Sequence, residues 1–424
     1  ALILVAFSLA GTAMGVMLRT RETYTNPELG QNNDALSAGI QGFPTTGREK
    51  WMGPSNPSFG NGYQGISYAG WGAPGSLWGS VYNSKVDLRH FRGAHTMSAG
   101  FEYGDSHTYG DHGSCCVRGN FGFNNLYTND GFADFLLGYT SSSSRNAPLA
   151  EFGTNRAPYT GTYFNDSWRV RQNLTIDMGL RYERWYARRN MRNATSTWDP
   201  KLQKVVAAVG SDGKINSAAF LNTPNVAAAT AGLWVTSREA GYNDGLMEGN
   251  GNWAPRIGLV YRPFAQRQIV LRGAYGLFYN SFTGNRSASS AANLPFWGVE
   301  SLSFGLSQLQ PWETVWSSDP NAFGIFGIGE AVDPRLKAAR TQNWNVTLQT
   351  ALPWKSALTV SYVGTKVTND VLFVPYNAAS VGPHTNLQAD RPNPLVSDVQ
   401  RLENGSRNWY HALQTKAERR FSNG

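Results

Sequence analysis

The chain has 424 residues, of which only 16% are charged and 13% are aromatic. Soluble domains carry charge at roughly 25% of positions, so this composition is typical of strands that cross a bilayer and carry Tyr and Trp at its edges. The mean hydropathy of −0.38 argues against a bundle of transmembrane helices. The net charge of +8 comes without a nucleic-acid motif, so no nucleic-acid partner is predicted.

The N-terminal stretch, residues 1–18, is an apolar run rich in small residues that ends at Arg19. It lacks a basic first part and an initiator Met, so it fits a signal peptide poorly, and it is barely long enough for a membrane helix. Because the sequence starts to alternate at Val16, residues 1–20 are predicted to contain a first strand. A trimmed signal segment and a spanning helix are the alternatives. The missing Met, and a predicted turn that begins at 421–424, indicate a fragment.

The rest of the chain repeats one unit, in which two alternating strands are joined by a short turn containing Gly, Pro or Asn. Such a unit is the pattern of a β-hairpin. The turns lie at 92–95, 170–173, 262–267 and 350–355. Their separations are too irregular for propeller blades. The clearest strand, 174–182, has one fully apolar face and one polar face, because successive strand residues point to opposite sides.

These patterns predict an all-β fold, an antiparallel up-and-down transmembrane β-barrel that is partial, with about 12–14 strands and long external loops. The four turns should lie on one rim. Besides the first strand, the predicted strands are 86–91, 96–103, 118–123, 139–145, 160–168, 174–182, 253–261, 268–279, 342–349, 357–365 and 409–420. The predicted external segments are 25–75, 187–252, 280–340 and 367–407. One helix, 130–137, is predicted to begin at the N-cap Asp130 and to cover the periplasmic side.

The two cysteines, Cys115 and Cys116, are adjacent and could pair only as a strained vicinal disulfide. Together with His107, Asp111 and His112 they could ligate a metal, but the spacing matches no common zinc pattern. Free thiols are the favoured interpretation, and no metal or cofactor is predicted. The sequence contains no GxSxG, HExxH or phosphate-binding loop, so no catalytic residue is proposed and the chain is not predicted to be an enzyme.

Eight segments occur in a distinctive order along the chain. They are FADFLLG (132–138), WRV (168–170), LTIDMGLRYE (174–183), WAPRIGL (253–259), LRGAYGLFY (271–279), QNWN (342–345), SYVG (361–364) and YHALQ to ERRF (410–421). Together they resemble the barrel of TonB-dependent outer-membrane receptors, in particular the Oar-like group with an N-terminal carboxypeptidase-regulatory-like domain. The resemblance implies a barrel of about 22 strands with a plugged lumen. It also implies a Ton box that recruits an energy-transducing inner-membrane complex.

No plug pattern, Ton box or terminal aromatic strand is recognised, so residues 1–424 are interpreted as a partial receptor barrel. The resemblance implies a receptor or transporter in the outer membrane of a Gram-negative bacterium that moves an oligosaccharide, a peptide or a metal chelate. The implied partners are outer-membrane lipid, lipopolysaccharide and, through parts of the receptor not seen here, the TonB-type complex. Arginines between 181 and 192 could contact lipopolysaccharide phosphates. The alternatives are a passive porin or adhesin-type barrel, and a secreted soluble carbohydrate-binding β-protein.

Two sets of residues are candidates for the ligand path. Aromatic residues of the external segments could stack on a ligand, although packing between loops is the favoured alternative: Trp198, Trp234, Tyr242, Phe296, Trp297, Trp312 and Trp316. Charged residues on the polar strand faces should face the lumen, with cross-strand salt bridges as the plainer explanation: Asp177, Arg181, Glu183, Arg272, Lys416 and Glu418.

Overall fold

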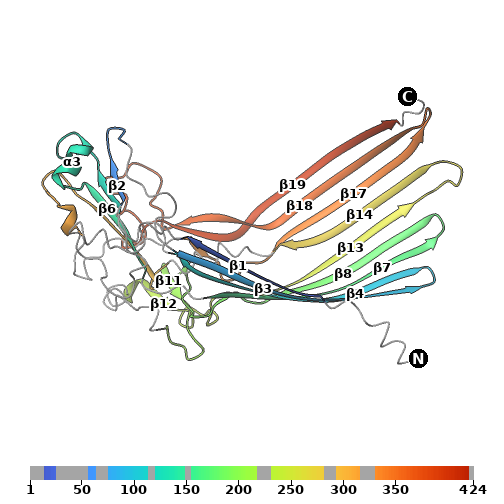
Figure 1. Cartoon of the computed structure of the whole chain (residues 1–424), viewed down its shortest axis with the longest axis horizontal. Helices are drawn as coiled ribbons and strands as arrows, with labels where there is room; N and C mark the ends of the chain where they lie inside the picture. The colour runs from blue at the N-terminus through green and yellow to red at the C-terminus, as the bar shows by residue number, and fades with distance from the viewer. Residues whose placement is uncertain are drawn as a thin grey trace.

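A large curved sheet dominates the protein, with a layer of loops, short strands and short helices at one end (Figure 1). The structure is a computed structural model, and it describes residues 14–24, 56–63, 75–112, 120–148, 154–216, 231–280, 293–315 and 330–419. In these ranges no helix is long and apolar enough to cross a membrane.

Ten long strands form the sheet as an antiparallel meander, in which each strand pairs with the next long strand of the chain. They are β1 (Met14–Tyr24), β3 (Gly75–Arg92), β4 (His95–His112), β7 (Asn155–Arg171), β8 (Leu174–Trp185), β13 (Asn250–Tyr261), β14 (Ile269–Asn280), β17 (Ala339–Leu352), β18 (Ser356–Tyr376) and β19 (Val399–Arg419). Two short strands complete the twelve: β16 (Glu330–Val332) pairs with β19, and β9 (Arg189–Asn190) pairs with β7. The predicted antiparallel meander is confirmed. Within the described residues β1 and β19 do not pair, so the barrel wall is open.

The hairpin turns lie on one rim, at the right-hand ends of the strands in Figure 1, as the sequence predicts. The turn between β3 and β4 contains only two residues, since Arg92 pairs directly with His95. Gly93 there has a φ of +56°, a conformation that glycine adopts without steric cost. In the turn between β17 and β18, Trp354 and Lys355 have φ values of +59° and +56°.

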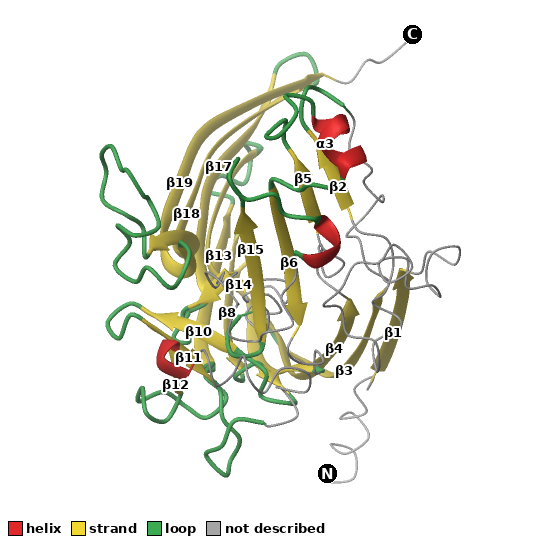
Figure 2. Cartoon of the chain, turned by 90° about the vertical axis from the view of Figure 1, so that its left-hand side faces the viewer, coloured by secondary structure: helices red, strands yellow, loops and turns green. Residues whose placement is uncertain are grey.

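Two of the predicted membrane strands are wrong. Segments 118–123 and 139–145 supply β5 (Asn120–Phe123) and the start of β6 (Ser142–Pro148), which lie in a separate four-stranded sheet between β2 (Asn56–Phe59) and β15 (Trp297–Ser303). Figure 2, seen from the loop end, shows this sheet in front of the arc of the large one. The alternating up-and-down direction of the strands could not expose this wrong assignment. Two extra strands reverse the chain twice, so every later strand keeps its predicted direction.

The predicted helix exists as α3 (Gly131–Leu137), and Asp130 caps it by accepting a hydrogen bond of 2.9 Å from the Ala133 amide. Its predicted place on the periplasmic side is wrong, because α3 lies at the loop end, far from the turns (Figure 1). Aromatic packing explains this position. Phe135 contacts Phe123 of β5 edge-to-face, with ring centres 5.2 Å apart, so the helix stays with the small sheet.

The main apolar core also lies in the loop layer. A third sheet, β10 (Ser196–Asp199), β11 (Lys204–Ala207) and β12 (Trp234–Thr236), packs there. Trp198 is fully buried in this core with Val205. Two 3-10 turns, η3 (Ala231–Leu233) and η5 (Trp312–Thr314), complete the layer. The large sheet joins these clusters at its loop end, where Ala331 of β16 and Val399 of β19 are buried.

The two faces of the large sheet differ in chemical character, because directly paired residues share a face. The Met178 face is mainly apolar, although Asp166 also lies on it and contacts Nδ1 of His95 at 2.7 Å. Met178 pairs with Asp166 and Ile257, whereas Asp177 pairs with Ser167 and Gly258. Large exposed side chains of the Met178 face are Phe101, Phe164, Leu180, Ile257, Leu259, Val346, Leu348, Tyr362 and Leu413. The Asp177 face is polar. This segregation is the pattern of a wall between lipid and a wet lumen.

We predict different costs for charge changes on the two faces. Met178 is 41% exposed on the apolar face, so Met178→Arg should cost about 2–4 kcal/mol near the bilayer midplane. Asp177→Asn should cost well under about 1 kcal/mol if residue 177 faces water. Unfolding of each variant in liposomes measures the difference.

Spin labels at the two positions test the environments directly. A label at 178 should be accessible to oxygen and shielded from a polar nickel reagent, and a label at 177 should show the reverse. If position 178 excludes both reagents, it lies in a protein core and the membrane assignment fails.

Candidate functional site: the polar face of the sheet

One continuous row of polar residues crosses the sheet on the Asp177 face. Hydrogen-bond register places its members opposite one another from β3 to β18: Arg89, Ser98, Asn165, Gly179, Arg256, Gly276, Asn343 and Thr365. Two hollows, of about 650 and 710 Å³, open along this row. Polar groups from several strands therefore line the same two hollows.

Small residues make room for side chains that lie flat on this face. A Cβ at Gly161 would lie 2.6 Å from Nη2 of Arg181, and one at Gly179 would collide with Oδ1 of Asn165. Because those spaces are filled by the neighbouring side chains, glycine at both positions sets where Arg181 and Asn165 lie.

A charged cluster lies beside the row, on the side farther from the hairpin turns. Arg181 forms ion pairs with Glu102 (Nη2 to Oε2, 2.9 Å) and Glu183 (Nε to Oε1, 2.6 Å) and also donates to the Tyr159 hydroxyl at 2.7 Å. Three strands, β4, β7 and β8, thus meet at one guanidinium. For Arg181 the salt-bridge explanation agrees with the structure.

The other predicted lumen residues are spread over the same face. Asp177 lines the smaller hollow. Lys416 and Glu418 form an ion pair on β19, with Nζ and Oε1 2.6 Å apart. Arg272 of β14 pairs with Thr347 and does not line either hollow. The structure therefore places all six on one face but brings only Arg181 and Glu183 into contact in a larger cluster.

Sequence reasoning missed two arginines that border both hollows, Arg89 and Arg256. The signal was present. Within the predicted strands 86–91 and 253–261, each occupies a polar position of the period-2 pattern.

The loop aromatics serve mainly as packing groups. Trp198 and Phe296 are 0% and 1% exposed, so neither ring is open to a ligand. Trp234 packs against the buried cluster of Trp198 and against that of Phe296. Trp312 packs against Phe121 and Phe123. Tyr242 is half-buried. Trp297 lies in β15, while Trp316, Cys115 and Cys116 lie outside the described residues.

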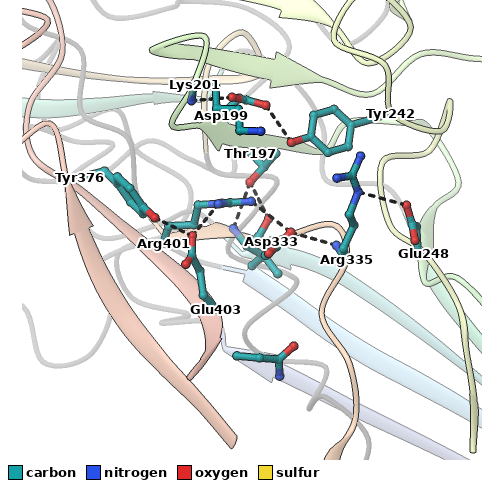
Figure 3. Close-up of polar contacts among 12 residues, drawn as sticks. Thr197, Asp199, Lys201, Tyr242, Glu248, Asp333, Arg335, Tyr376, Arg401 and Glu403 are labelled. Carbon is teal, nitrogen blue, oxygen red and sulfur yellow. Dashed lines mark hydrogen bonds and ion pairs between the residues drawn. The ribbon is translucent and has the colours of Figure 1, made fainter. Parts of the chain in front are cut away.

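Figure 3 shows the polar network that holds the loop layer to the sheet. Buried Arg401 lies 3.1 Å (Nη2 to Oδ1) from Asp333 and 2.5 Å (Nη1 to Oε1) from Glu403, and Tyr376 donates to Glu403 at 3.0 Å. The network joins the end of β18, the start of β19 and the loop after β16. Among the described residues no group of three or more side chains is arranged to hold a metal ion.

A second contact ties the third sheet together. The Tyr242 hydroxyl donates to Asp199 at 2.8 Å. Burial, followed by this hydrogen bond to a carboxylate, raises the pKa of Tyr242 to about 12. Tyr242 is therefore a structural donor in the loop layer.

A family model described as an outer membrane beta barrel domain matches residues 9–424, almost the whole chain. The chain belongs to this family. It is a membrane barrel domain of the Gram-negative outer membrane, not an enzyme, and the soluble carbohydrate-binding alternative is wrong. No curated protein matches the chain.

Several solved outer-membrane proteins are similar to part of this chain. The outer membrane transporter YddB from Escherichia coli is 12% identical, with a TM-score of 0.45, over 86% of this chain and 34% of its own. The hemophore receptor HasR of Serratia marcescens is 14% identical, with a TM-score of 0.38, over 81% of this chain and 40% of its own. The FrpB iron transporter from Neisseria meningitidis is 10% identical, with a TM-score of 0.39, over 82% of this chain and 34% of its own. The barrel thus spans well under half the length of these proteins.

We predict that Arg401 stabilises the loop layer. Arg401→Ala leaves Asp333 and Glu403 without their cation. The substitution should lower the stability of the loop layer by about 3 kcal/mol. This is the lower end for a broken buried ion pair, because both carboxylates retain some water contact. Cleavage of the loops by protease should then accelerate about 100-fold. Arg335→Ala is the matched control. Its ion pair with Glu248 is exposed and should contribute under about 1 kcal/mol. Equal cleavage rates for the two variants would contradict the prediction.

We also predict that His384 titrates above its ordinary pKa. Its Nδ1 lies 2.8 Å from Asp390 Oδ2 and its Nε2 lies 2.6 Å from the Ser380 carbonyl, so only the imidazolium can donate to both. The Asp390 hydrogen bond, then that of Ser380, raises the pKa of His384. The stabilisation is present below the unfolded pKa, about 6.5, and is lost as the pH rises through the folded pKa.

Nuclear magnetic resonance of histidine-labelled protein gives this pKa directly. Asp390→Asn should lower the pKa of His384 and leave the other histidines unchanged. A wild-type value at or below about 6.5 would show that the contact is not formed.

Proposed function

We propose that this barrel domain forms part of the wall of a TonB-dependent receptor or transporter that moves a small ligand across the outer membrane. The observation that carries the proposal is the hollowed polar face, where charged and amide side chains from six or more strands line about 650 and 710 Å³ of space. The folded loop layer over one rim supports it, since such a layer can admit a ligand from outside. Asp177, Arg181 and Glu183 would face the lumen, together with Arg272, Lys416 and Glu418.

The energy for transport would come from an inner-membrane complex acting through a segment outside these 424 residues. Lipid would cover the apolar face, and lipopolysaccharide phosphates would meet the arginines near the outer rim. A passive porin or adhesin-type barrel is the alternative within the same family. The two differ in their need for energy.

Uptake in a Gram-negative host tests the proposal. The gene carrying this chain is expressed in the outer membrane of cells with and without TonB, and the uptake of small solutes is compared. Transport should require TonB. Equal uptake in both strains would support the passive porin and overturn the proposal.

A cysteine scan checks the path itself. In a background that carries Cys115→Ser and Cys116→Ser, Ser98→Cys, on the polar face, should react with a water-soluble maleimide added from outside, and Phe101→Cys, on the apolar face, should not. The matched pair lies on one strand, β4, so strand accessibility is the same for both. Equal labelling of the two positions would show that the polar face does not line the aqueous path.

A further inference from the structure

Two arginines of the polar row, Arg89 and Arg256, form no ion pair within the described ranges. Arg89 of β3 and Arg256 of β13 lie in the same row, separated by Ser98, Asn165 and Gly179. In the described part of the chain neither forms an ion pair with a carboxylate, although both border both hollows. Four inter-strand spacings put their Cα atoms about 19 Å apart along the curved sheet, so the side chains flank a common floor.

The larger hollow has an excess of positive charge. Its lining includes four cations and two carboxylates, which gives a net charge of +2 (4 − 2): Lys85, Arg89, Arg181, Arg256, Asp87 and Glu102. Both carboxylates are already paired. Asp87 binds Lys85 (Nζ to Oδ2, 3.1 Å) and accepts from Tyr163, and Glu102 binds Arg181. The unbalanced charge is therefore that of the two arginines.

The floor between the two arginines can donate to a ligand. Asn165 donates its amide to Oγ of Ser98 at 3.4 Å. This bond leaves the Ser98 hydroxyl proton free to donate. Together with the two guanidiniums, that proton favours a ligand that supplies acceptors.

We propose that this row binds an anionic solute carrying carboxylate or phosphate groups between Arg89 and Arg256. The planar guanidinium matches both groups through paired hydrogen bonds. Arg256 is held in place by Phe278, whose ring centre lies 4.5 Å from the guanidinium carbon. Asp177 lines only the smaller hollow, one step nearer the turns, so it disfavours an anion there. The inference rests on the proposed function, which brings solutes to this face.

Binding to the refolded full chain in detergent tests the inference without any transport step. Titration calorimetry uses citrate as the carboxylate probe, pyrophosphate as the phosphate probe and maltose as the uncharged probe. Citrate, pyrophosphate or both should bind and maltose should not. Arg89→Gln and Arg256→Gln should each weaken binding by about tenfold or more.

Arg267→Gln is the matched control, because Arg267 lies in the turn between β13 and β14, outside both hollows, and it should change the affinity less than twofold. The stronger of the two anions identifies the acidic group. Absence of anion binding, equal maltose binding, or equal losses in Arg267→Gln and Arg89→Gln would each overturn the inference. TonB-dependent uptake in cells would stand in any of those cases, so failure here is distinguishable from failure of the proposed function.

Discussion

The register between neighbouring strands is the constraint on which the rest of the structure depends. In hydrocarbon every backbone N–H and C=O must be paired within the protein, and the ladders from β1 to β19 supply those pairs. A slip of one residue in any ladder would turn that strand's apolar residues toward the lumen and its charges toward lipid. The pairing of Met178 with Ile257, and of Asp177 with Gly258, shows the register that avoids this.

The same register assembles the candidate site. Arg89 and Arg256 are far apart in the chain, yet consecutive ladders bring them into one row over a shared hollow. Neither arginine forms an ion pair among the described residues, because the carboxylates of the larger hollow, Asp87 and Glu102, bind Lys85 and Arg181. Paired charges thus build the wall, and the unpaired ones are left for a ligand.

The loop layer follows different physics. It stands in water, so it needs its own apolar core, which forms around Trp198, and it is tied to the sheet through buried Arg401. Aromatic residues in long loops are therefore weak indicators of ligand binding. In this protein Trp198 and Phe296 are buried in the packing that lets the loops fold.

The sequence by itself determined the strands, the turns and the two faces, because alternation of side chains along a strand and the needs of a tight turn at Gly93 are local properties. The position of each segment relative to the membrane could not be determined from local sequence alone. The segment 118–145 has strand and helix patterns that fit either a barrel wall or an external sheet. The pairing of β5 and β6 with β2 and β15, together with the contact of Phe135 with Phe123, decides between them. The partners of Arg89, Arg181 and Arg256 were likewise undetermined, since they depend on which strands become neighbours. Only the tertiary structure decided which charges are paired and which remain free.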